Sequence, residues 1–395
     1  MNAGPLGGIR VADFSRVLSG PWCTMTLADL GADVVKVERP GEGDETRGWG
    51  PPFAGGEAAY FLSTNRGKRS IALDLRREDH REVARRLVDA ADVLVENFRP
   101  GTMERLGFGE QECRARNPGL VYASISGFGL DGPARDDPGY DFIIQGRGGL
   151  MSITGSPASG PMKAGVAISD ITAGLYSAIG IVAALRQRDR TGHGPRVHVS
   201  LLGAQVSWLA NQASNYLVGG LDPTRMGNAH PNIVPYQVFH ASDRSFVLAV
   251  ANETIWGRFC SAIGRPELRD DARFARNRDR VEHRTALVED LARVFAARTR
   301  DAWIEAFAAA QVPCGPINTV AEVFQDEAVR ALGMVQSVAH PSAGELAQVR
   351  APIDVGGRAL PVRRPPPTTG QHTEEILRVL GYDDDDVASM LAEAR

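Results

Sequence analysis

The sequence predicts an α/β protein with a large, Rossmann-like domain built on an open parallel sheet and a smaller α+β domain. Through the first 130 residues, short apolar runs alternate with helical patterns, and this βαβ rhythm implies a parallel sheet covered by helices. Near residue 220 the pattern changes to mostly helical segments. The length of 395 residues suits two domains, and a hydrophobic content of 43% is enough to build their cores.

The expected elements of the large domain follow from apolar runs and the residues that flank them. Apolar runs of strand length predict strands over residues 9–14, 33–38, 92–96, 120–125 and 197–201. Helical patterns predict helices over residues 21–30, 78–90, 171–185 and 201–217, and Gly and Pro predict a loop over residues 40–56. The ligand site of such a sheet lies at the carboxyl ends of its strands.

The segment after about residue 220 is expected to form the smaller domain. Its predicted elements are a strand over residues 246–250 and helices over residues 254–262, 284–297 and 300–310. We therefore assign residues 1–220 to the first part of the large domain and residues 225–325 to the small domain. A β-like stretch over residues 333–367 and two helices over residues 373–380 and 384–394 complete the chain.

Composition and charge narrow the class of protein. The net charge of -4 argues against a nucleic-acid surface. The four cysteines form no CxxC pair and indicate reduced thiols in a cytoplasmic protein. No secretory signal is expected from Met1 to Pro5, and the apolar run from Ile171 to Leu185 is shorter than the roughly 20 residues of a membrane span. We expect no membrane partner.

The common cofactor motifs are missing. The turn after the first strand carries only Gly20 where GxGxxG requires three glycines, and no GxxxxGK[ST] occurs, which argues against NAD and ATP. No HExxH or GxSxG is present, so neither a zinc protease nor an α/β-hydrolase is indicated. We expect no metal and no permanently bound cofactor.

One carboxylate stands apart in the chain. Asp170 is the only ionisable side chain between Lys163 and Tyr176, and it precedes a helix that is apolar on nearly every face. It is either the N-cap of that helix or a nucleophile, and the two roles are compatible, because a helix N-terminus stabilises the anion. From a reference pKa of about 3.9, an upward shift of two units still leaves roughly 90% of the group ionised at pH 7.

A series of segments, in this order, resembles the family III CoA-transferases, which include formyl-CoA transferase and the carnitine and bile-acid CoA-transferases. The segments are residues 13–21, 30–38, 43–47, 65–70, 95–101, 139–141, 149–155 and 312–316. The resemblance covers essentially the whole chain. It implies an interlocked homodimer of ring-like subunits, with residues 330–395 returning to the large domain.

The resemblance also implies which residues act. Asp170 falls on the catalytic aspartate, which is expected to carry CoA between carboxylic acids in a ping-pong reaction through an aspartyl-CoA thioester. Acyl-CoA and a small carboxylic acid are the expected substrates. The implied CoA contacts are Leu18, Ser19, Arg39, Leu73, Asp74, Leu75, Arg76, Asn97, Phe98, Arg99, Arg105, Asp137, Pro138, Gly139 and Tyr140. Arginines suit the phosphates of CoA, and Phe98 suits its adenine.

The sequence departs from formyl-CoA transferase in two places. Residues 226–236 replace its glycine run and Leu18 replaces its glutamine, which argues against oxalate as the acceptor. His230, Asn232 and Tyr236 are candidate donors to the second carboxylate of a dicarboxylate such as succinate. The alternative is that they only shape the linker into the small domain. The effect of Gly203, at a position that is acidic in many relatives, stays open.

Two other functions remain as alternatives. An α-methylacyl-CoA racemase needs a histidine base before its aspartate, but the corresponding segment is Gly139-Tyr140-Asp141. A tyrosine with a pKa of about 10 is a poor base at pH 7. A non-catalytic CoA-binding module would lack the nucleophile, yet Asp170 is present.

Overall fold

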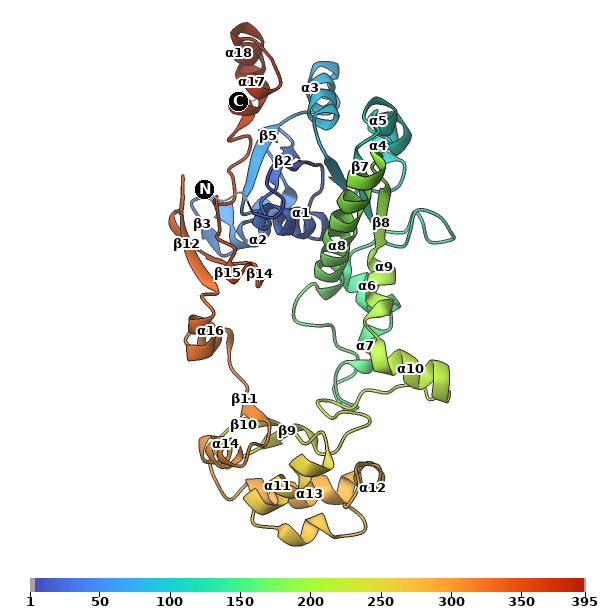
Figure 1. Cartoon of the computed structure of the whole chain (residues 1–395), viewed down its shortest axis with the longest axis vertical. Helices are drawn as coiled ribbons and strands as arrows, with labels where there is room; N and C mark the ends of the chain where they lie inside the picture. The colour runs from blue at the N-terminus through green and yellow to red at the C-terminus, as the bar shows by residue number, and fades with distance from the viewer. Residues whose placement is uncertain (1–3, 394–395) are drawn as a thin grey trace. The chain divides into compact units, whose positions relative to one another are not determined.

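The computed structural model describes residues 4–393 (Figure 1). Met1–Ala3 of the segment considered for a signal, and Ala394 of the last expected helix, lie outside the described residues. The chain divides into two compact units, called here the large and the small domain. The large domain comprises Met1–Leu150, Ala164–Asn211 and Arg330–Arg395, and the small domain comprises Met151–Lys163 and Gln212–Val329. Unlike the division drawn from sequence, this one assigns Met151–Lys163 to the small domain.

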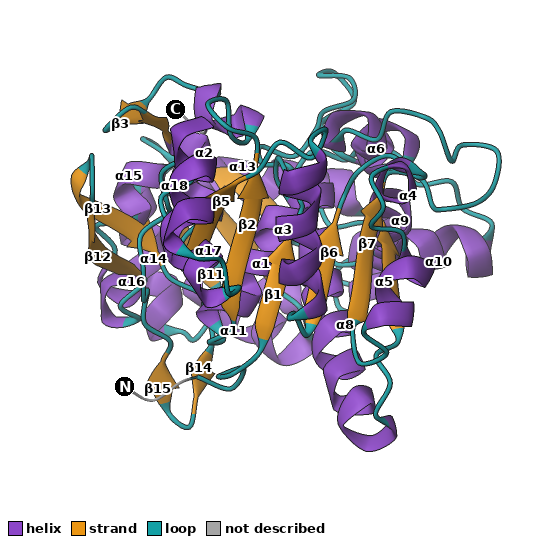
Figure 2. Cartoon of the chain, turned by 90° about the horizontal axis from the view of Figure 1, so that it is seen from above, coloured by secondary structure: helices purple, strands orange, loops and turns teal. Residues whose placement is uncertain are grey.

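A six-stranded parallel sheet forms the centre of the large domain, and the predicted α/β class is confirmed (Figure 2). Its spatial order is β5 (Lys68–Ala72), β2 (Asp33–Glu38), β1 (Arg10–Asp13), β6 (Val93–Glu96), β7 (Val121–Ser126) and β8 (Arg196–Ser200). Numbered along the chain, this is the 3-2-1-4-5-6 order of a doubly wound fold. Its topological switch point, where ligands bind, lies between β1 and β6.

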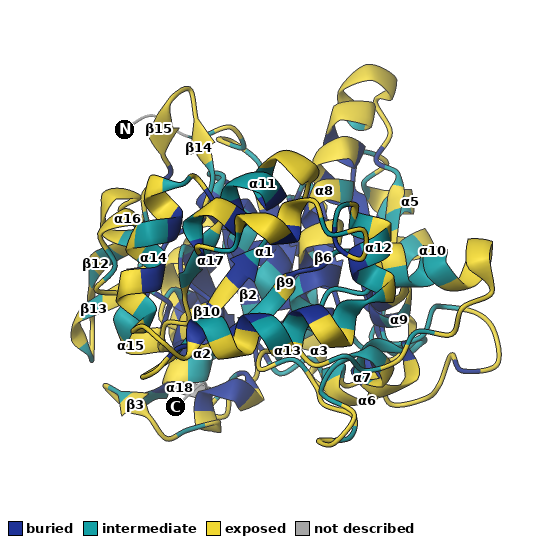
Figure 3. Cartoon of the chain, turned by 90° about the horizontal axis from the view of Figure 1, so that it is seen from below, coloured by how far each residue is buried: buried dark blue, intermediate teal, exposed yellow. Residues whose placement is uncertain are grey.

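Helices cover both faces of the sheet, and each face has its own core. Val11 and Val34 pack against α1 (Ser19–Asp29), α8 (Ile168–Thr191) and α9 (Leu201–Ser207). Their chain neighbours Ala12 and Val35 point to the other face, toward α3 (Glu78–Asp89), α5 (Glu110–Arg116) and α17 (Thr373–Val379). The central strands are therefore buried on both sides, whereas the edge strand β8 is only partly covered (Figure 3).

Three sequence-based expectations need correction. The strand β5 was not predicted, because Lys68, Arg69 and Ser70 give it a polar appearance although all five of its residues are buried. The predicted helix over residues 171–185 runs from Ile168 to Thr191. The single helix expected over residues 201–217 is two helices, α9 and α10 (Ala210–Gly219), because Ala210 has a φ of +42°.

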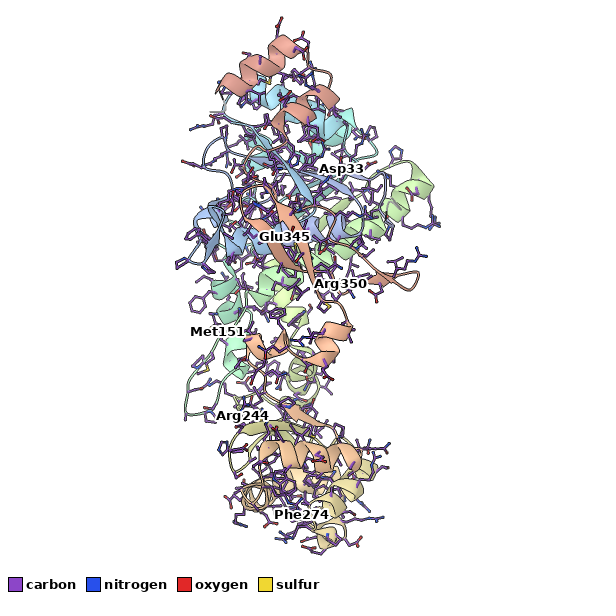
Figure 4. The ribbon with its side chains drawn as sticks, turned by 90° about the vertical axis from the view of Figure 1, so that its left-hand side faces the viewer. Asp33, Met151, Arg244, Phe274, Glu345 and Arg350 are labelled. Carbon is purple, nitrogen blue, oxygen red and sulfur yellow. The ribbon has the colours of Figure 1, made fainter. Side chains whose placement is uncertain are left out.

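The remaining elements of the large domain are short. They are η1 (Glu45–Gly48), β3 (Phe53–Ala54), β4 (Glu57–Ala58), α2 (Ala59–Thr64), α4 (Thr102–Arg105), α6 (Asp141–Arg147), the hairpins β12 (Val335–His340)–β13 (Gly344–Val349) and β14 (Asp354–Val355)–β15 (Arg358–Ala359), and α18 (Asp384–Glu393). Two further short helices, α7 (Leu150–Ile153) and α16 (Glu327–Ala331), each include a point in the chain where one domain ends and the other begins. Arg350, which follows the β13 strand of Glu345 (Figure 4), donates to the Leu332 carbonyl at 2.9 Å and to the Ala351 carbonyl at 2.7 Å. These bonds tie the end of the hairpin to the chain that enters it.

The small domain has an aromatic core under a three-stranded antiparallel sheet. The sheet order is β11 (Cys314–Pro316), β10 (Ser245–Ala249) and β9 (Tyr236–His240). The helices are α11 (Glu253–Ala262), η2 (Pro266–Arg269), α12 (Asn277–Glu282), α13 (Arg284–Phe295), α14 (Arg300–Ala309) and α15 (Val320–Val323). Phe295 makes edge contacts with Phe246 and Trp303 at ring distances of 5.2 and 5.3 Å, and Phe274 (Figure 4) belongs to the same core.

The helix α8 is long and apolar enough to span a membrane by length and composition alone. The expectation that its apolar segment is too short was therefore wrong. Ala173, Ile181 and Leu185 of this helix are nevertheless buried in the core against the sheet. A core helix passes the same test of hydropathy, so this feature carries no separate conclusion.

Candidate active site

A pocket of about 520 Å³ opens at the carboxyl ends of β1, β2, β5 and β6, where the doubly wound order predicts a ligand. Seven of the predicted CoA contacts line it, namely Arg39, Leu73, Asp74, Leu75, Arg76, Phe98 and Arg99. A larger depression of about 1020 Å³ lies in the small domain between α11 and α14. It is open to solvent and contains none of the predicted residues, so we place the site in the large domain.

Two arginines at the pocket have side chains exposed enough to contact phosphates. The side chain of Arg39 is 79% exposed and its nearest carboxylate, Glu42, is 3.9 Å away. Arg76 is 89% exposed and donates to both oxygens of Asp74 at 2.9 and 2.8 Å. Arg105 does not line the pocket, but it donates to Thr102 at 2.9 Å, and Thr102 does.

A clamp formed by Asn97 joins the ends of β1 and β6. The Asn97 amide donates to the Arg16 carbonyl at 2.8 Å, and its oxygen accepts the Arg16 N–H at 2.9 Å. The same amide lies 3.3 Å from the hydroxyl of Ser19. Ser19 in turn hydrogen-bonds to Asp170. Leu18, Ser19 and Asn97 therefore lie beside the pocket, between it and the predicted nucleophile.

The segment from Asp137 to Tyr140 crosses the end of β7. A Cβ atom on Gly139 would lie 2.4 Å from the Cα of Gly127, so both glycines are required for this close approach. Tyr140, at the N-cap of α6, is 57% exposed. The structure therefore brings these predicted residues to the carboxyl edge of the sheet, although they do not line the pocket.

Asp170 is not the N-cap of α8, contrary to one of the two expectations. The helix begins at Ile168 with Ala167 as its N-cap, so Asp170 lies in the first turn. The carboxylate of Asp141 takes the capping role from outside the helix: its Oδ1 accepts the N–H of Ser169 at 2.8 Å and that of Asp170 at 3.4 Å. The side chain of Asp170 is thereby free for chemistry.

The environment of Asp170 opposes its ionisation. Burial and then the nearby charge of Asp141 raise the pKa of Asp170 to about 7, against a smaller lowering by the Ser19 hydrogen bond. The rise exceeds the two units for which the sequence analysis expected about 90% ionisation, because the sequence could not reveal the neighbouring carboxylate. About half of Asp170 is ionised at pH 7, and its anion is more basic than an ordinary aspartate.

Tyr60 is a neighbour that the sequence did not indicate. Burial, followed by the charges of Asp170 and Asp141, raises the pKa of Tyr60 to about 12. Its hydroxyl therefore stays protonated at neutral pH and lies within electrostatic range of both carboxylates. Nothing in the residues around Tyr60 distinguishes it from a core tyrosine, whereas Asp141 belongs to the Gly-Tyr-Asp segment that supported the resemblance.

A buried group of charges underlies the pocket and was also missed. Lys68 lies 3.1 Å from Asp13, and Lys36 lies 2.9 Å from Asp44, with all four side chains at most 1% exposed. One signal could have indicated them: the chain has 44 basic residues, but only three are lysines. Where arginine is so abundant, a lysine marks a site that needs a compact charge.

The three predicted substrate residues lie together in the small domain. The Nδ1 of His230 accepts the N–H of Asn232 at 3.1 Å, which assigns the proton of the neutral ring to Nε2, and its ring is 5.1 Å from that of Tyr236. Burial, followed by the charge of Arg284, lowers the pKa of His230. Arg284, which the sequence did not indicate, donates through one nitrogen to the carbonyls of His230 and Pro231, at 2.8 and 2.9 Å.

Metal ligation has no candidate site here. Within residues 4–393, no three histidine, cysteine or acidic side chains gather closely enough to hold an ion.

Comparison with known proteins identifies the family. The sequence model of CoA-transferase family III matches residues 6–373. A succinate–glutarate CoA-transferase from Agrobacterium fabrum is 44% identical over 382 residues, covering 95% of this chain and 96% of that protein. A succinyl-CoA:glutarate CoA-transferase from Homo sapiens is 39% identical over 392 residues, covering 99% and 90%. The crystal structure of a CaiB/BaiF family protein from Brucella suis has a TM-score of 0.85 at 45% identity, covering 96% and 100%.

These matches confirm the resemblance that the sequence segments indicated. The relatives are named as transferases, which agrees with a site that has Tyr140 where a racemase needs a histidine. The matched region includes both domains and the predicted nucleophile. The chain is a CoA-transferase and belongs to CoA-transferase family III.

Proposed function

We propose that the enzyme moves CoA between two carboxylic acids through a covalent intermediate on Asp170. A carboxylate oxygen of Asp170 attacks the thioester carbonyl of the donor acyl-CoA, and the C–S bond breaks to give an acyl-aspartyl anhydride and CoA thiolate. The thiolate then attacks the Asp170 carbonyl carbon. The anhydride C–O bond breaks, so the donor acid leaves as its carboxylate and an aspartyl-CoA thioester remains.

The acceptor acid completes the cycle by the same steps in reverse. Its carboxylate attacks the aspartyl-CoA carbonyl and again forms an anhydride and free thiolate. Attack of the thiolate on the acceptor carbonyl yields the new acyl-CoA and restores the Asp170 carboxylate. No net proton transfer is needed, and the energy of the thioester bond is conserved, because donor, enzyme and acceptor are all carboxylates.

One observation carries this proposal: Asp170 is hydrogen-bonded to Ser19, which the Asn97 clamp holds at the edge of the pocket. CoA bound in the pocket would bring its thioester toward the carboxylate. Ser19, which hydrogen-bonds to Asp170, is suited to stabilise negative charge that develops during attack, and the protonated hydroxyl of Tyr60 is a second candidate donor.

Replacing Asp170 tests the mechanism. Asp170→Ala and Asp170→Asn should lower the transfer rate at least about 10³-fold, since neither side chain is an adequate nucleophile. CoA binding, measured by calorimetry, should change less than about threefold, because the phosphates are bound elsewhere. Asp189→Asn, on the exposed end of the same helix, is the matched control and should retain full activity. Near-normal turnover in Asp170→Ala would exclude the mechanism.

We propose a dicarboxylate such as succinate or glutarate as the acceptor. The neutral His230 presents its Nε2 proton, and Arg284 has a second guanidinium nitrogen, Nη1, that is buried without a hydrogen-bond partner in the described part of the chain. A carboxylate would satisfy both groups. Relatives at 39% and 44% identity are named for succinate and glutarate, which supports the same class.

The acceptor proposal is tested by comparing two acids of equal length. His230→Ala should raise the KM for glutarate by about tenfold and leave the KM for pentanoate within twofold, since a site built for a polar group discriminates by that group. His240→Ala, an exposed histidine of the same domain, serves as the control. Equal effects of His230→Ala on both acids would show that His230 only shapes the linker.

We also propose that the enzyme works as a homodimer. The helix α8 leaves a row of apolar side chains exposed at one-turn spacing, formed by Leu175, Ile179 and Val182, and Ile179 is 65% exposed. A second copy is the occupant that the family resemblance implies. Light scattering should give twice the chain mass, and Ile179→Glu should shift it toward the monomer. A wild-type monomer with full activity would refute this proposal.

We propose a cytoplasmic location. The four cysteines are free and three of them are buried, which suits a reducing compartment. Cell fractionation would test this location directly, and recovery of the protein in the membrane fraction would contradict it.

A further inference from the structure

The turn between β1 and α1 contains a strained residue. Val17 has a φ of +66°, in the left-handed region that disfavours side chains branched at Cβ. Among the residues that the structure describes, the other non-glycine positions in this region are Ala210 and Gln311, neither of which is branched. Val17 lies two positions before Ser19, whose hydroxyl bonds to Asp170. The strain is therefore stored next to the proposed nucleophile.

The carboxylate of Asp44 is placed to hold this conformation. The backbone nitrogen of Val17 donates to Asp44, at 3.2 Å from Oδ2 and 3.4 Å from Oδ1. Lys36 fixes the same carboxylate, because its Nζ lies 2.9 Å from Oδ2 and also donates to the Ser15 carbonyl at 2.7 Å. Both charged side chains are 1% exposed. Lys36 and Asp44 together therefore hold the backbone of the turn at Ser15 and Val17.

The other anchors of the turn are independent of Asp44. Asn97 bonds both backbone groups of Arg16, and the hydroxyl of Ser15 bonds to Asp13. The Asn97 bond to the Arg16 carbonyl and the Asp44 bond to the Val17 N–H hold the two ends of one planar peptide group, which fixes one side of the φ rotation of Val17. The φ of Val17 sets the direction in which the chain continues to Leu18 and Ser19. Without Asp44, only the carbonyl end of this peptide group and the long Asn97–Ser19 hydrogen bond of 3.3 Å remain. We expect Val17 then to relax toward a negative φ and to turn the Ser19 hydroxyl away from Asp170.

We propose that Asp44 is a positioning residue of the transfer reaction. By accepting the Val17 N–H while paired to Lys36, it keeps residue 17 left-handed and sets the Ser19 hydroxyl on Asp170. It acts through Ser19 and not on the reacting carbonyl. This inference rests on the proposed role of Asp170 as the nucleophile.

The test is a rescue experiment at residue 17. Asp44→Ala should lower kcat about 30- to 100-fold, with the KM for acyl-CoA within about threefold. Adding Val17→Gly to the Asp44→Ala variant should raise kcat at least tenfold, because glycine adopts a positive φ without strain. Val17→Ala should restore less than threefold, since alanine keeps the Cβ atom. Each value is expressed relative to the same residue-17 variant that retains Asp44.

The contrast between glycine and alanine separates positioning from folding. A merely structural role of Asp44 predicts no rescue by glycine, because Val17→Gly adds freedom to the unfolded chain. Equal recovery with both residues, or recovery with neither, would overturn the proposal. If Asp44→Ala fails to fold because Lys36 is left unpaired, the same comparison is made in a Lys36→Met/Asp44→Ala background, with the same outcomes.

A parallel measurement keeps this inference distinct from the proposed function. CoA attachment to Asp170 is measured in the wild-type enzyme. If CoA does not become attached, Asp170 is not the nucleophile, and the proposed positioning role of the turn at Val17 fails with it. Attachment of CoA, together with no rescue specific to glycine, would refute the role of Asp44 alone.

Discussion

Two groups of carboxylates in the large domain, one fully and one partly buried, have opposite electrostatic surroundings. Asp44 lines the pocket and Asp13 lies outside its lining, and each faces a buried lysine. Asp170 lies beside the pocket and has another carboxylate, Asp141, as its charged neighbour. The same side chain is thus held as a stable anion in one place and kept from ionising fully in the other.

The difference shows in the direction of the pKa shifts. Burial alone raises the pKa of Asp13, but the charges of Lys68 and Lys36 and the hydrogen bonds of Ser15 and Thr24 bring it below its ordinary value. Burial of Asp170 is reinforced by a like charge, and its pKa rises to about 7. Burial therefore makes a carboxylate structural where cations surround it and reactive where they are missing.

The largest predicted effect on stability is at the paired group. Asp13→Asn leaves the Lys68 ammonium buried without its counter-ion, and should lower the free energy of unfolding by about 3–5 kcal/mol. Asp79→Asn breaks an ion pair with Arg77 whose side chains are 46% and 41% exposed, and should change it by less than about 1 kcal/mol. Urea titration measures both. Equal effects would remove the distinction between the buried network and the surface.

At Asp170 we expect the opposite effect, because replacing this aspartate should raise the free energy of unfolding. The folded pKa of about 7 exceeds the unfolded value of 3.8, so folding opposes ionisation, and stability falls as the pH rises from about 4 to 7. Asp170→Asn removes this cost and should stabilise the protein by about 1–2 kcal/mol at pH 8, with no gain at pH 4. Thermal unfolding at both pH values measures the difference. If Asp170→Asn instead lost stability at pH 8, the folded protein would have to stabilise the ionised carboxylate of Asp170.

The smallest predicted effect concerns the pH profile. Transfer requires ionised Asp170, so kcat/KM should rise with pH through about 7 and then level off. Asp141→Asn keeps an acceptor for the Ser169 N–H but removes the like charge, and should move the midpoint down by about one pH unit. Asp136→Asn, an exposed position with no assigned contact to CoA, is the control. An unmoved midpoint in Asp141→Asn would leave burial as the only cause.

The fold was largely predictable from the sequence because apolar periodicity specifies it. Five of the six sheet strands were predicted from short apolar runs, and the pattern changes near residue 220, close to where the main part of the small domain begins at Gln212. The strand β5 escaped because Lys68 is buried by an ion pair that only the tertiary structure supplies. The short helices were not predicted, because a helix of one or two turns is too short to show a hydrophobic period in the sequence.

The site was predictable only where a local motif reports it. Asp170 stood out as an isolated carboxylate before an apolar helix, and the pocket lies where parallel strands end. The contribution of Asp141 depends on two segments that are 29 residues apart in sequence and meet at the helix start. Tyr60, Arg284 and the strain at Val17 are properties of packing and backbone conformation, and no residue pattern records them.

The central claim is that Asp170 becomes covalently linked to CoA during transfer. The most direct test is to incubate the enzyme with succinyl-CoA, quench it with acid, digest it, and weigh the peptide that contains residue 170. The account predicts that this peptide gains the mass of CoA less one water, that added glutarate removes the adduct, and that Asp170→Asn shows none. Turnover without any adduct on this peptide, or an adduct on a different carboxylate, would contradict it.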